Sequence, residues 1–302
     1  MALGKRLINT SSAAAILGPN PSDITSVQSN TISGGTYRFV DMYMDKINGD
    51  KVYYIRNGGF DMNRIALATM STPFDLSTLS LVGTSTNWSI GSYASRIHGI
   101  RGGGSYVITS GYQNSDNNRN ITQYNTSSPW AIPTSFTNVA QRTNGTGGTN
   151  ILNISDDGSK FYYSKDSTHI VQLSLSTPFS ISTQSYEKEK EFNLISSDFI
   201  QKDYTSAAWH IVNGDWFVGG FTFYVLMEYW DGAQISARKI KAYDTTVAFD
   251  VEFLSDRGNS TDYNLSLFST GGGQGFSVSD FGHFLVGEQD ANNGNQEWWL
   301  LS

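Results

Sequence analysis

Short runs in which apolar and polar residues alternate recur along the chain. Residues 170–175, Ile-Val-Gln-Leu-Ser-Leu, are one such run. Alternation of this kind is the pattern of a half-buried β-strand. Asn-Gly and Asp-Gly dipeptides between such runs are strong hairpin signals. The pattern predicts an all-β protein built from antiparallel hairpins.

A glycine turn that leads into an aromatic strand is the first repeat. The turn glycines are Gly49, Gly104, Gly158, Gly214 and Gly282, at spacings of 55, 54, 56 and 68 residues. A short apolar segment precedes each turn, at residues 39–44, 97–100, 151–154, 209–212 and 276–278. Each segment and the strand after its turn therefore predict one hairpin.

A proline corner is the second repeat. Ser-Thr-Pro-Phe-Asp-Leu-Ser-Thr at residues 71–78 recurs in modified form at 127–134 and at 176–183. The fourth unit has no such proline motif, and we assign its degenerate corner to Tyr-Trp-Asp-Gly at 229–232.

Together, the repeats define a unit of strand, glycine turn, strand, loop, strand, corner and strand. Four strands in roughly 55 residues is the size of one β-propeller blade. The five glycine turns predict a five-bladed propeller. A six-bladed ring is the alternative, with residues 262–267 as a strand of a degenerate blade within 251–273.

The two ends of the chain complement each other. The last unit stops at residues 298–302 without a corner or a fourth strand, whereas residues 21–27 mirror residues 73–79. We expect the N-terminal segment to supply the missing outer strand, because this exchange closes the ring and covers an open sheet edge. Residues 19–302 then form the propeller domain, and residues 1–18 form an N-terminal arm.

Charged residues are expected on the outermost strands, where they discourage edge-to-edge pairing. Residues 186–192, Tyr-Glu-Lys-Glu-Lys-Glu-Phe, and residues 237–243, Ala-Arg-Lys-Ile-Lys-Ala-Tyr, are the two segments that fit. The extra chain at 251–273 is predicted to be a long outer strand and a loop insertion.

Composition narrows the classes of function. Of the 302 residues, 16% are charged, 13% are aromatic and none is cysteine, which excludes disulfides and thiol catalysis. A net charge of −7 argues against non-specific binding to nucleic acid. No apolar run approaches the ~20 residues of a membrane span, so no membrane insertion is expected.

The repeat motifs resemble those of virion proteins of tailed, marine-type bacteriophages. The resemblance is carried by Gly4–Ile8, by the corners at Pro73, Pro129 and Pro178, and by Asp-Asp-Gly-Ser-Lys-Phe-Tyr at 156–162. It covers most of the chain, although the fourth and fifth units depart from it. It implies a non-enzymatic structural or adhesive component of the particle, in the tail rather than the capsid. Capsid decoration is the alternative within this family.

Two regions are candidates for contacts with partners. The basic arm is expected to dock to other virion proteins, whereas a frayed terminus is the plain alternative. Two polar loops are expected on one face of the disc, where they would meet host glycan or neighbouring virion proteins, with ordinary turns as the alternative. We expect several copies in the particle. The arm residues are Lys5, Arg6, Leu7 and Ile8, and the loop residues are Asn114, Asp116, Asn117, Asn118, Asp290, Asn292 and Asn293.

A glycoside hydrolase is the main enzymatic alternative, and a free lectin is another. Hydrolysis needs two carboxylates that face one central pocket. The innermost segments offer Asp41, Asp45 and Asp280, and a general acid could come from Glu288 or Glu228. The segments at 97–100 and 209–212 offer none. We therefore expect no enzymatic activity, no catalytic residues, and no cofactor or metal, with His98 and His210 as ordinary imidazoles of two inner strands.

Overall fold

The structure is a computed structural model of the chain. It describes residues 16–32, 38–57, 63–84, 94–99, 106–112, 119–125, 128–131, 137–144, 152–164, 169–191, 208–231, 235–265, 274–289 and 295–302. Its helices are 3₁₀ turns of three residues each, and none of these could cross a membrane.

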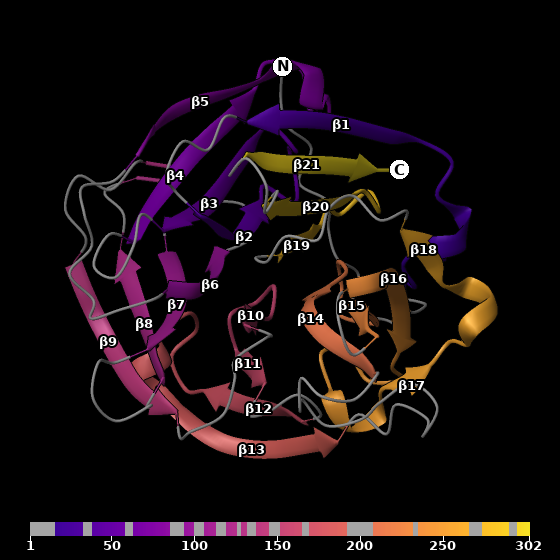
Figure 1. Cartoon of the computed structure of the whole chain (residues 1–302). Coiled ribbons are helices and arrows are strands. Elements are labelled where there is room, and N and C mark those ends of the chain that lie inside the picture. The colour runs from indigo at the N-terminus through magenta and orange to yellow at the C-terminus, as the bar shows by residue number, and fades with distance from the viewer. Residues whose placement is uncertain are drawn as a thin grey trace, which may run out of the picture.

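The described strands form antiparallel sheets around a common centre, which confirms the predicted all-β propeller (Figure 1). The sheets are β2 (Arg38–Met44), β3 (Lys51–Asn57), β4 (Asn63–Met70) and β5 (Leu79–Thr84); β6 (Ala94–Gly99), β7 (Tyr106–Tyr112), β8 (Arg119–Asn125) and β9 (Thr137–Asn144); β10 (Leu152–Ile154), β11 (Lys160–Ser164), β12 (His169–Leu175) and β13 (Gln184–Glu191); β14 (Ala208–Trp216), β15 (Thr222–Trp230), β16 (Ile235–Asp244), β17 (Ser255–Asp256) and β18 (Tyr263–Leu265); and β19 (Gln274–Val278), β20 (Phe284–Gln289), β21 (Gln296–Leu301) and β1 (Val27–Ile32).

The first strand of each sheet lies nearest the centre. These inner strands are β2, β6, β10, β14 and β19, and each contacts the next. Because β19 also contacts β2, the inner strands close a ring. Side chains on the inner strands of different sheets can therefore meet at the axis.

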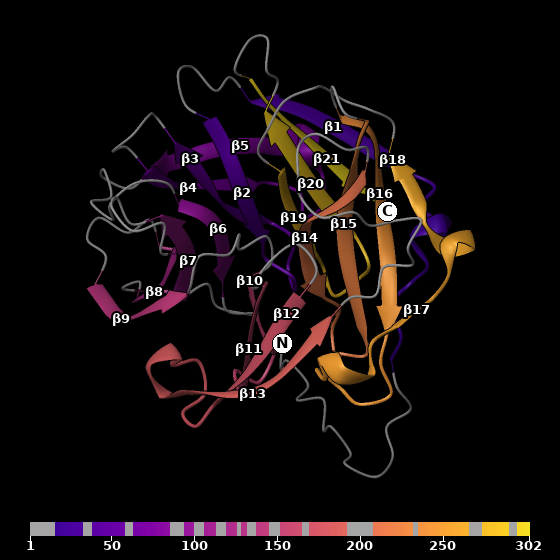
Figure 2. The ribbon, with the colours of Figure 1, turned by 60° about the horizontal axis from the view of Figure 1, so that its bottom comes forward.

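The expected strand exchange is observed. β1 pairs antiparallel with β21, from Val27 opposite Leu301 to Ile32 opposite Gln296. Both views show β1 on the outer side of β21 (Figures 1 and 2). The last residue takes part as well, since the carbonyl of Ser302 accepts hydrogen bonds from the backbone N–H groups of Thr25 and Ser26. The N-terminal segment therefore completes the sheet that contains the C-terminal strand.

The glycine turns and the corners form one structural unit. The corner aromatics Phe74, Trp130, Phe179 and Phe249 all have a positive φ of 56° to 60°. In the third sheet the N–H of Phe179 donates to the carbonyl of Gly158, at 2.9 Å. A Cβ at Gly158, whose φ is 70°, would lie 2.5 Å from the Phe179 ring. Glycine is required there because the aromatic ring occupies the place of its side chain.

The fourth sheet differs from the sequence prediction in register. β14 continues to Trp216, so Gly214 lies within a strand, and the turn is made by Gly219 and Gly220 at φ of 81° and 73°. The fourth corner is not at 229–232, because Tyr229 and Trp230 are the last two residues of β15. It is at Phe249, just before the 3₁₀ turn η4 (Val251–Phe253). The Asn213-Gly214 dipeptide has the composition of a hairpin turn, and for this reason the sequence prediction placed the turn too early.

Of the two charged segments, one is an outer strand. β13 is the outermost strand of the third sheet, as predicted for 186–192. β16 is the third strand of its sheet, with β17 and β18 paired to its outer edge (Figure 2). The lysines of β16 are buried against this cover, with Lys241 2.9 Å from Asp256 and Lys239 3.4 Å from Asp262. The segment offered as a sixth blade therefore contributes β18 to the fourth sheet.

Tyrosine hydroxyls connect neighbouring sheets through the corners. Each one lies on the second strand of a sheet and donates to a backbone carbonyl at the corner of the next sheet. The pairs are Tyr53 to Ala131 at 2.7 Å, Tyr162 to Phe249 at 2.5 Å, and Tyr224 to Pro19 at 2.6 Å.

Glutamine side chains make the complementary contacts. Gln123 of β8 donates to the carbonyl of Phe179 at 2.7 Å and accepts from the N–H of Ile181 at 3.0 Å. Gln28 of β1 does the same with Phe74 and Leu76, which joins the last sheet to the first. The corners are thus fixed to the adjacent sheet as well as to their own glycine turn.

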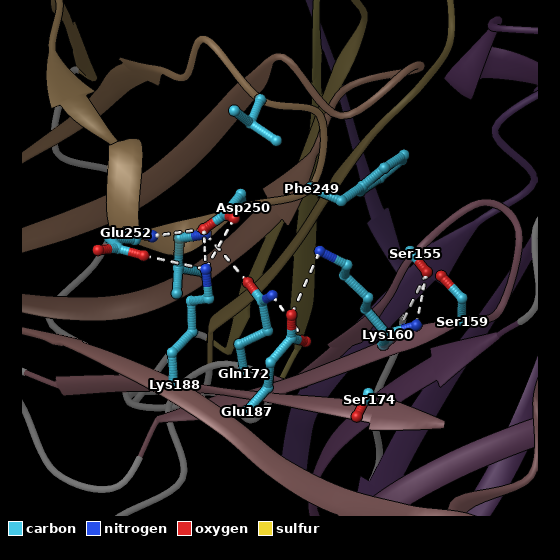
Figure 3. Close-up of polar contacts among 12 residues, drawn as sticks. Ser155, Ser159, Lys160, Gln172, Ser174, Glu187, Lys188, Phe249, Asp250 and Glu252 are labelled. Atoms are coloured by element: carbon cyan, nitrogen blue, oxygen red, sulfur yellow. Dashed lines mark hydrogen bonds and ion pairs between the residues drawn. The ribbon is translucent and has the colours of Figure 1, made fainter. Parts of the chain in front are cut away.

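Figure 3 shows one such junction, between the third and fourth sheets. Gln172 accepts a hydrogen bond from the N–H of Val251 at 3.0 Å. Beside it, the ammonium group of Lys188 lies 2.8 Å from Asp250 and 3.0 Å from Glu252. Polar contacts therefore fix the position of the fourth corner against β12 and β13.

Replacing the turn glycine tests the glycine–aromatic unit. Gly158→Ala should destabilise the protein by about 2–4 kcal/mol, from the positive φ together with overlap on the Phe179 ring. Gly219→Ala is the matched control, because its φ of 81° is similar but the atom nearest to the added Cβ lies 3.9 Å away. Urea unfolding gives both values, and equal losses for the two variants would contradict this account.

Candidate functional site

β-Bulges mark three of the inner strands. The pairing register shifts between Phe39 and Asp41 in β2, between Ala94 and Arg96 in β6, and between Ile211 and Asn213 in β14. A bulge re-aims the side chains beside it, and bulges are over-represented next to active sites. The residues that follow the three shifts are polar but buried, with exposures of 2% for Asp41, 8% for Arg96 and 4% for Asn213.

These three residues meet at the axis. One carboxylate oxygen of Asp41 accepts from the backbone N–H of Ile97 at 2.9 Å, and the other accepts from the amide of Asn213 at 2.8 Å. Arg96 donates to the carbonyl of Val212 at 2.7 Å. The contacts join β2, β6 and β14, although β14 is not a neighbour of β2 or β6 in the ring.

Asp41 carries a proton more readily than an ordinary aspartate. Burial raises its pKa from 3.8 to about 7, and the Arg96 charge and the two hydrogen bonds offset only part of that effect. Asp41 therefore exchanges its proton near neutral pH, which is the range in which general acids and bases work.

Asp215 is a second carboxylate of the axis, and contacts from the four other sheets converge on it. Lys46, just after β2, donates to it at 2.5 Å, Asn153 of β10 at 2.6 Å, and the N–H of Val278 in β19 at 2.9 Å. His98 of β6 lies 3.8 Å away. Burial acts to raise the pKa of Asp215, but Lys46 and His98 outweigh it and hold the pKa well below its ordinary value.

His98 packs against Tyr43 at the axis. Its ring centroid lies 4.7 Å from that of Tyr43. Burial lowers its pKa below the ordinary value, and Asp215 only partly opposes the effect. The side chain of His210 on β14 lies outside the described residues.

Of the carboxylates predicted from the sequence, Asp41 belongs to this network. Asp45 caps the turn after β2 instead, since its side chain accepts from the N–H groups of Ile47 and Asn48. Asp280 lies in the turn between β19 and β20. Glu288 on β20 forms a buried ion pair with Arg238, and Glu228 lies within β15, so neither is a loop residue as expected.

Asp215 was missed because of the error in register. The sequence interpretation ended the inner segment at residue 212 and placed Asp215 beyond a turn. The signal that could have found it is the alternation of Asn213 and Asp215, which puts both side chains on one face of a longer strand.

The predicted contact regions lie outside the described residues. They are the arm residues Lys5, Arg6, Leu7 and Ile8, and the loop residues Asn114, Asp116, Asn117, Asn118, Asp290, Asn292 and Asn293. Within the described part of the chain, no group of three or more His, Asp or Glu side chains is arranged to hold a metal ion.

Solved structures with a similar fold include glycoside hydrolases. A GH43 enzyme engineered to display both endo-xylanase and exo-arabinofuranosidase activity matches with a TM-score of 0.54 and 12% identity, over 90% of this chain and 51% of that chain. The GH43 protein BlXynB from Bacillus licheniformis matches with a TM-score of 0.55 and 14% identity, over 90% and 54%. The endo-arabinase from Bacteroides thetaiotaomicron matches with a TM-score of 0.52 and 13% identity, over 87% and 93%.

The chain thus spans about half the length of the first two of these structures and nearly all of the third. No protein-family model matches it, and no curated protein sequence matches it. At 12–14% identity the likeness establishes the fold. The finding contradicts the prediction of a non-enzyme, which rested on the motif resemblance, because the fold is one that glycoside hydrolases share.

Removing the charge of Asp215 should be costly. Asp215→Asn leaves Lys46 buried without its carboxylate, and loss of one partner of a buried pair costs about 3–5 kcal/mol. Asp50→Asn is the control, since it breaks a half-exposed pair with Lys51 that should contribute at most about 1 kcal/mol. Urea unfolding at pH 7 measures both, and similar losses would contradict the role of Asp215 as the centre of the network.

Proposed function

We propose that the chain is a glycoside hydrolase in which the five sheets are the blades of one closed propeller and Asp41 is the proton-transfer group. The observation that carries the proposal is Asp41 itself, an axis carboxyl whose pKa is raised to about 7. The fold shared with glycoside hydrolases supports the reaction class.

Hydrolysis of a glycosidic bond begins with a proton given to the leaving oxygen. Protonated Asp41 donates that proton as the bond between the sugar carbon and the oxygen breaks. Water then bonds to the sugar carbon and releases one proton, which restores protonated Asp41 through solvent. Asp215 stays ionised throughout. Pairs of carboxyls whose surroundings push their pKa values apart are the usual arrangement for such chemistry.

Access to Asp41 is part of the proposal. Because its exposure is 2%, its proton reaches a substrate only when the covering groups move or when a water bridges the two. The same burial raises the pKa of the carboxyl to about 7, so low exposure and the ability to donate a proton near neutral pH have one cause.

Hydrolysis is tested with aryl glycosides of common sugars and with xylan and arabinan. Asp41→Asn should lower the rate by about 10²–10⁴-fold, the usual contribution of general acid catalysis. The wild-type rate should be high below pH 7 and fall as the pH rises past 7, because the acid must be protonated. Asp45→Asn, which alters a turn cap, should retain activity. Absence of hydrolysis by the wild-type chain, or full activity of Asp41→Asn, would refute the proposal.

We propose separately that the protein is carried on a phage particle, through the arm and with the polar loops toward host glycan. The support is the sequence of Gly4–Ile8 and of the corners. Deleting residues 1–15 should abolish incorporation into particles and leave a folded disc, since Gly18, Pro19 and Asn20 keep their contacts with Arg257. Incorporation of the truncated chain, assayed on purified particles, would contradict this role of the arm.

A further inference from the structure

The bulge of β14 reaches across the axis to the carboxyl of Asp41 and to Arg96. We infer that this bulge controls the protonation of Asp41. Asn213 is a positioning residue that donates a hydrogen bond to Asp41, and Arg96 supplies a positive charge whose position is set by its hydrogen bond to the carbonyl of Val212. The inference depends on the proposed function only for its effect on catalysis, since the protonation of Asp41 can be measured without any substrate.

The amide of Asn213 has a fixed orientation. Its oxygen accepts from the N–H of Gly214 at 2.8 Å, so its nitrogen must face Asp41, to which it donates at 2.8 Å. The other oxygen of Asp41 already accepts from the N–H of Ile97. Donors on both oxygens favour the ionised carboxylate, because a proton on either oxygen has to compete with an N–H group.

Arg96 depends on the same bulge. Its guanidinium donates to the carbonyl of Val212, the residue at the register shift of β14. The positive charge favours ionised Asp41, in opposition to burial. A displacement of the bulge would therefore change two influences on Asp41 together, the Asn213 hydrogen bond and the position of the Arg96 charge.

The other charged groups of the axis are directed elsewhere. Asp215, two residues beyond Asn213 on β14, is paired with Lys46. His98, two residues beyond Arg96 on β6, lies 3.8 Å from Asp215, and burial lowers its pKa. The described neighbours that act on Asp41 are thus Asn213, Arg96 and the backbone around Asp41 and Ile97.

The test is a titration of Asp41 by carbon NMR of the side-chain carboxyls. Its signal is identified by its loss in Asp41→Asn. The midpoint should rise by about one pH unit in Asn213→Ala and in Arg96→Gln, because each removes an interaction that favours the ionised form. Asn153→Ala is the matched control, since its amide donates to Asp215 and should leave the midpoint of Asp41 unchanged.

A midpoint that stays constant in both Asn213→Ala and Arg96→Gln overturns the inference, even in an active hydrolase. A midpoint that rises supports it, even if no glycoside is hydrolysed. If Asn213→Ala fails to fold, Asn213→Ser and Arg96→Gln provide the same comparison. In an active enzyme, the pH at which the rate falls should rise with the midpoint, which a purely structural role of Asn213 would not produce.

Discussion

The hydrogen bonds and the ion pair of the Asp215 carboxylate are the interactions on which the centre of the molecule depends. Inner strands that close a ring bring polar side chains together with little exposure to water, and such groups must satisfy one another. Asp215 meets this requirement because it accepts hydrogen bonds from Lys46, Asn153 and the N–H of Val278 and lies close to His98. One residue of the fourth sheet therefore contacts each of the four other sheets. The position of β14 follows from these contacts.

Because these contacts fix β14, Asp41 and Asp215 have different surroundings and therefore different pKa values. Lys46 donates to Asp215, and the positive charge that acts on Asp41 is the guanidinium of Arg96, which donates to the carbonyl of Val212. Burial therefore outweighs the opposing interactions at Asp41, whereas at Asp215 the interactions with Lys46 and His98 together outweigh burial. Two residues of the same type in one network acquire different pKa values because Lys46 and His98 act on only one of them.

Much of the fold could be predicted from the sequence, whereas less of the site could. The turn glycines at 49 and 158 and the corner prolines at 73 and 178 mark sheets whose strands follow the expected order. The fourth sheet was misread because Asn213-Gly214 has the composition of a turn but lies in a strand. Asp41 was found because it lies in a clear inner segment. Bulges leave no local signal in a single sequence, so the meeting of Arg96 and Asn213 with Asp41 could not be foreseen.

The pairing of β1 with β21 also constrains the order of folding. The fifth sheet contains strands from both ends of the described chain, and the backbone of Ser302 is bonded to that of Thr25 and Ser26. The first four sheets can pair from nearby segments as they leave the ribosome, but this sheet must wait until β21 has been made. Until then, the apolar inner faces of the first and fourth sheets lack their common neighbour. The last stage of folding is therefore the joining of two distant segments, which is a slow kind of contact because a long loop must close before the contact forms.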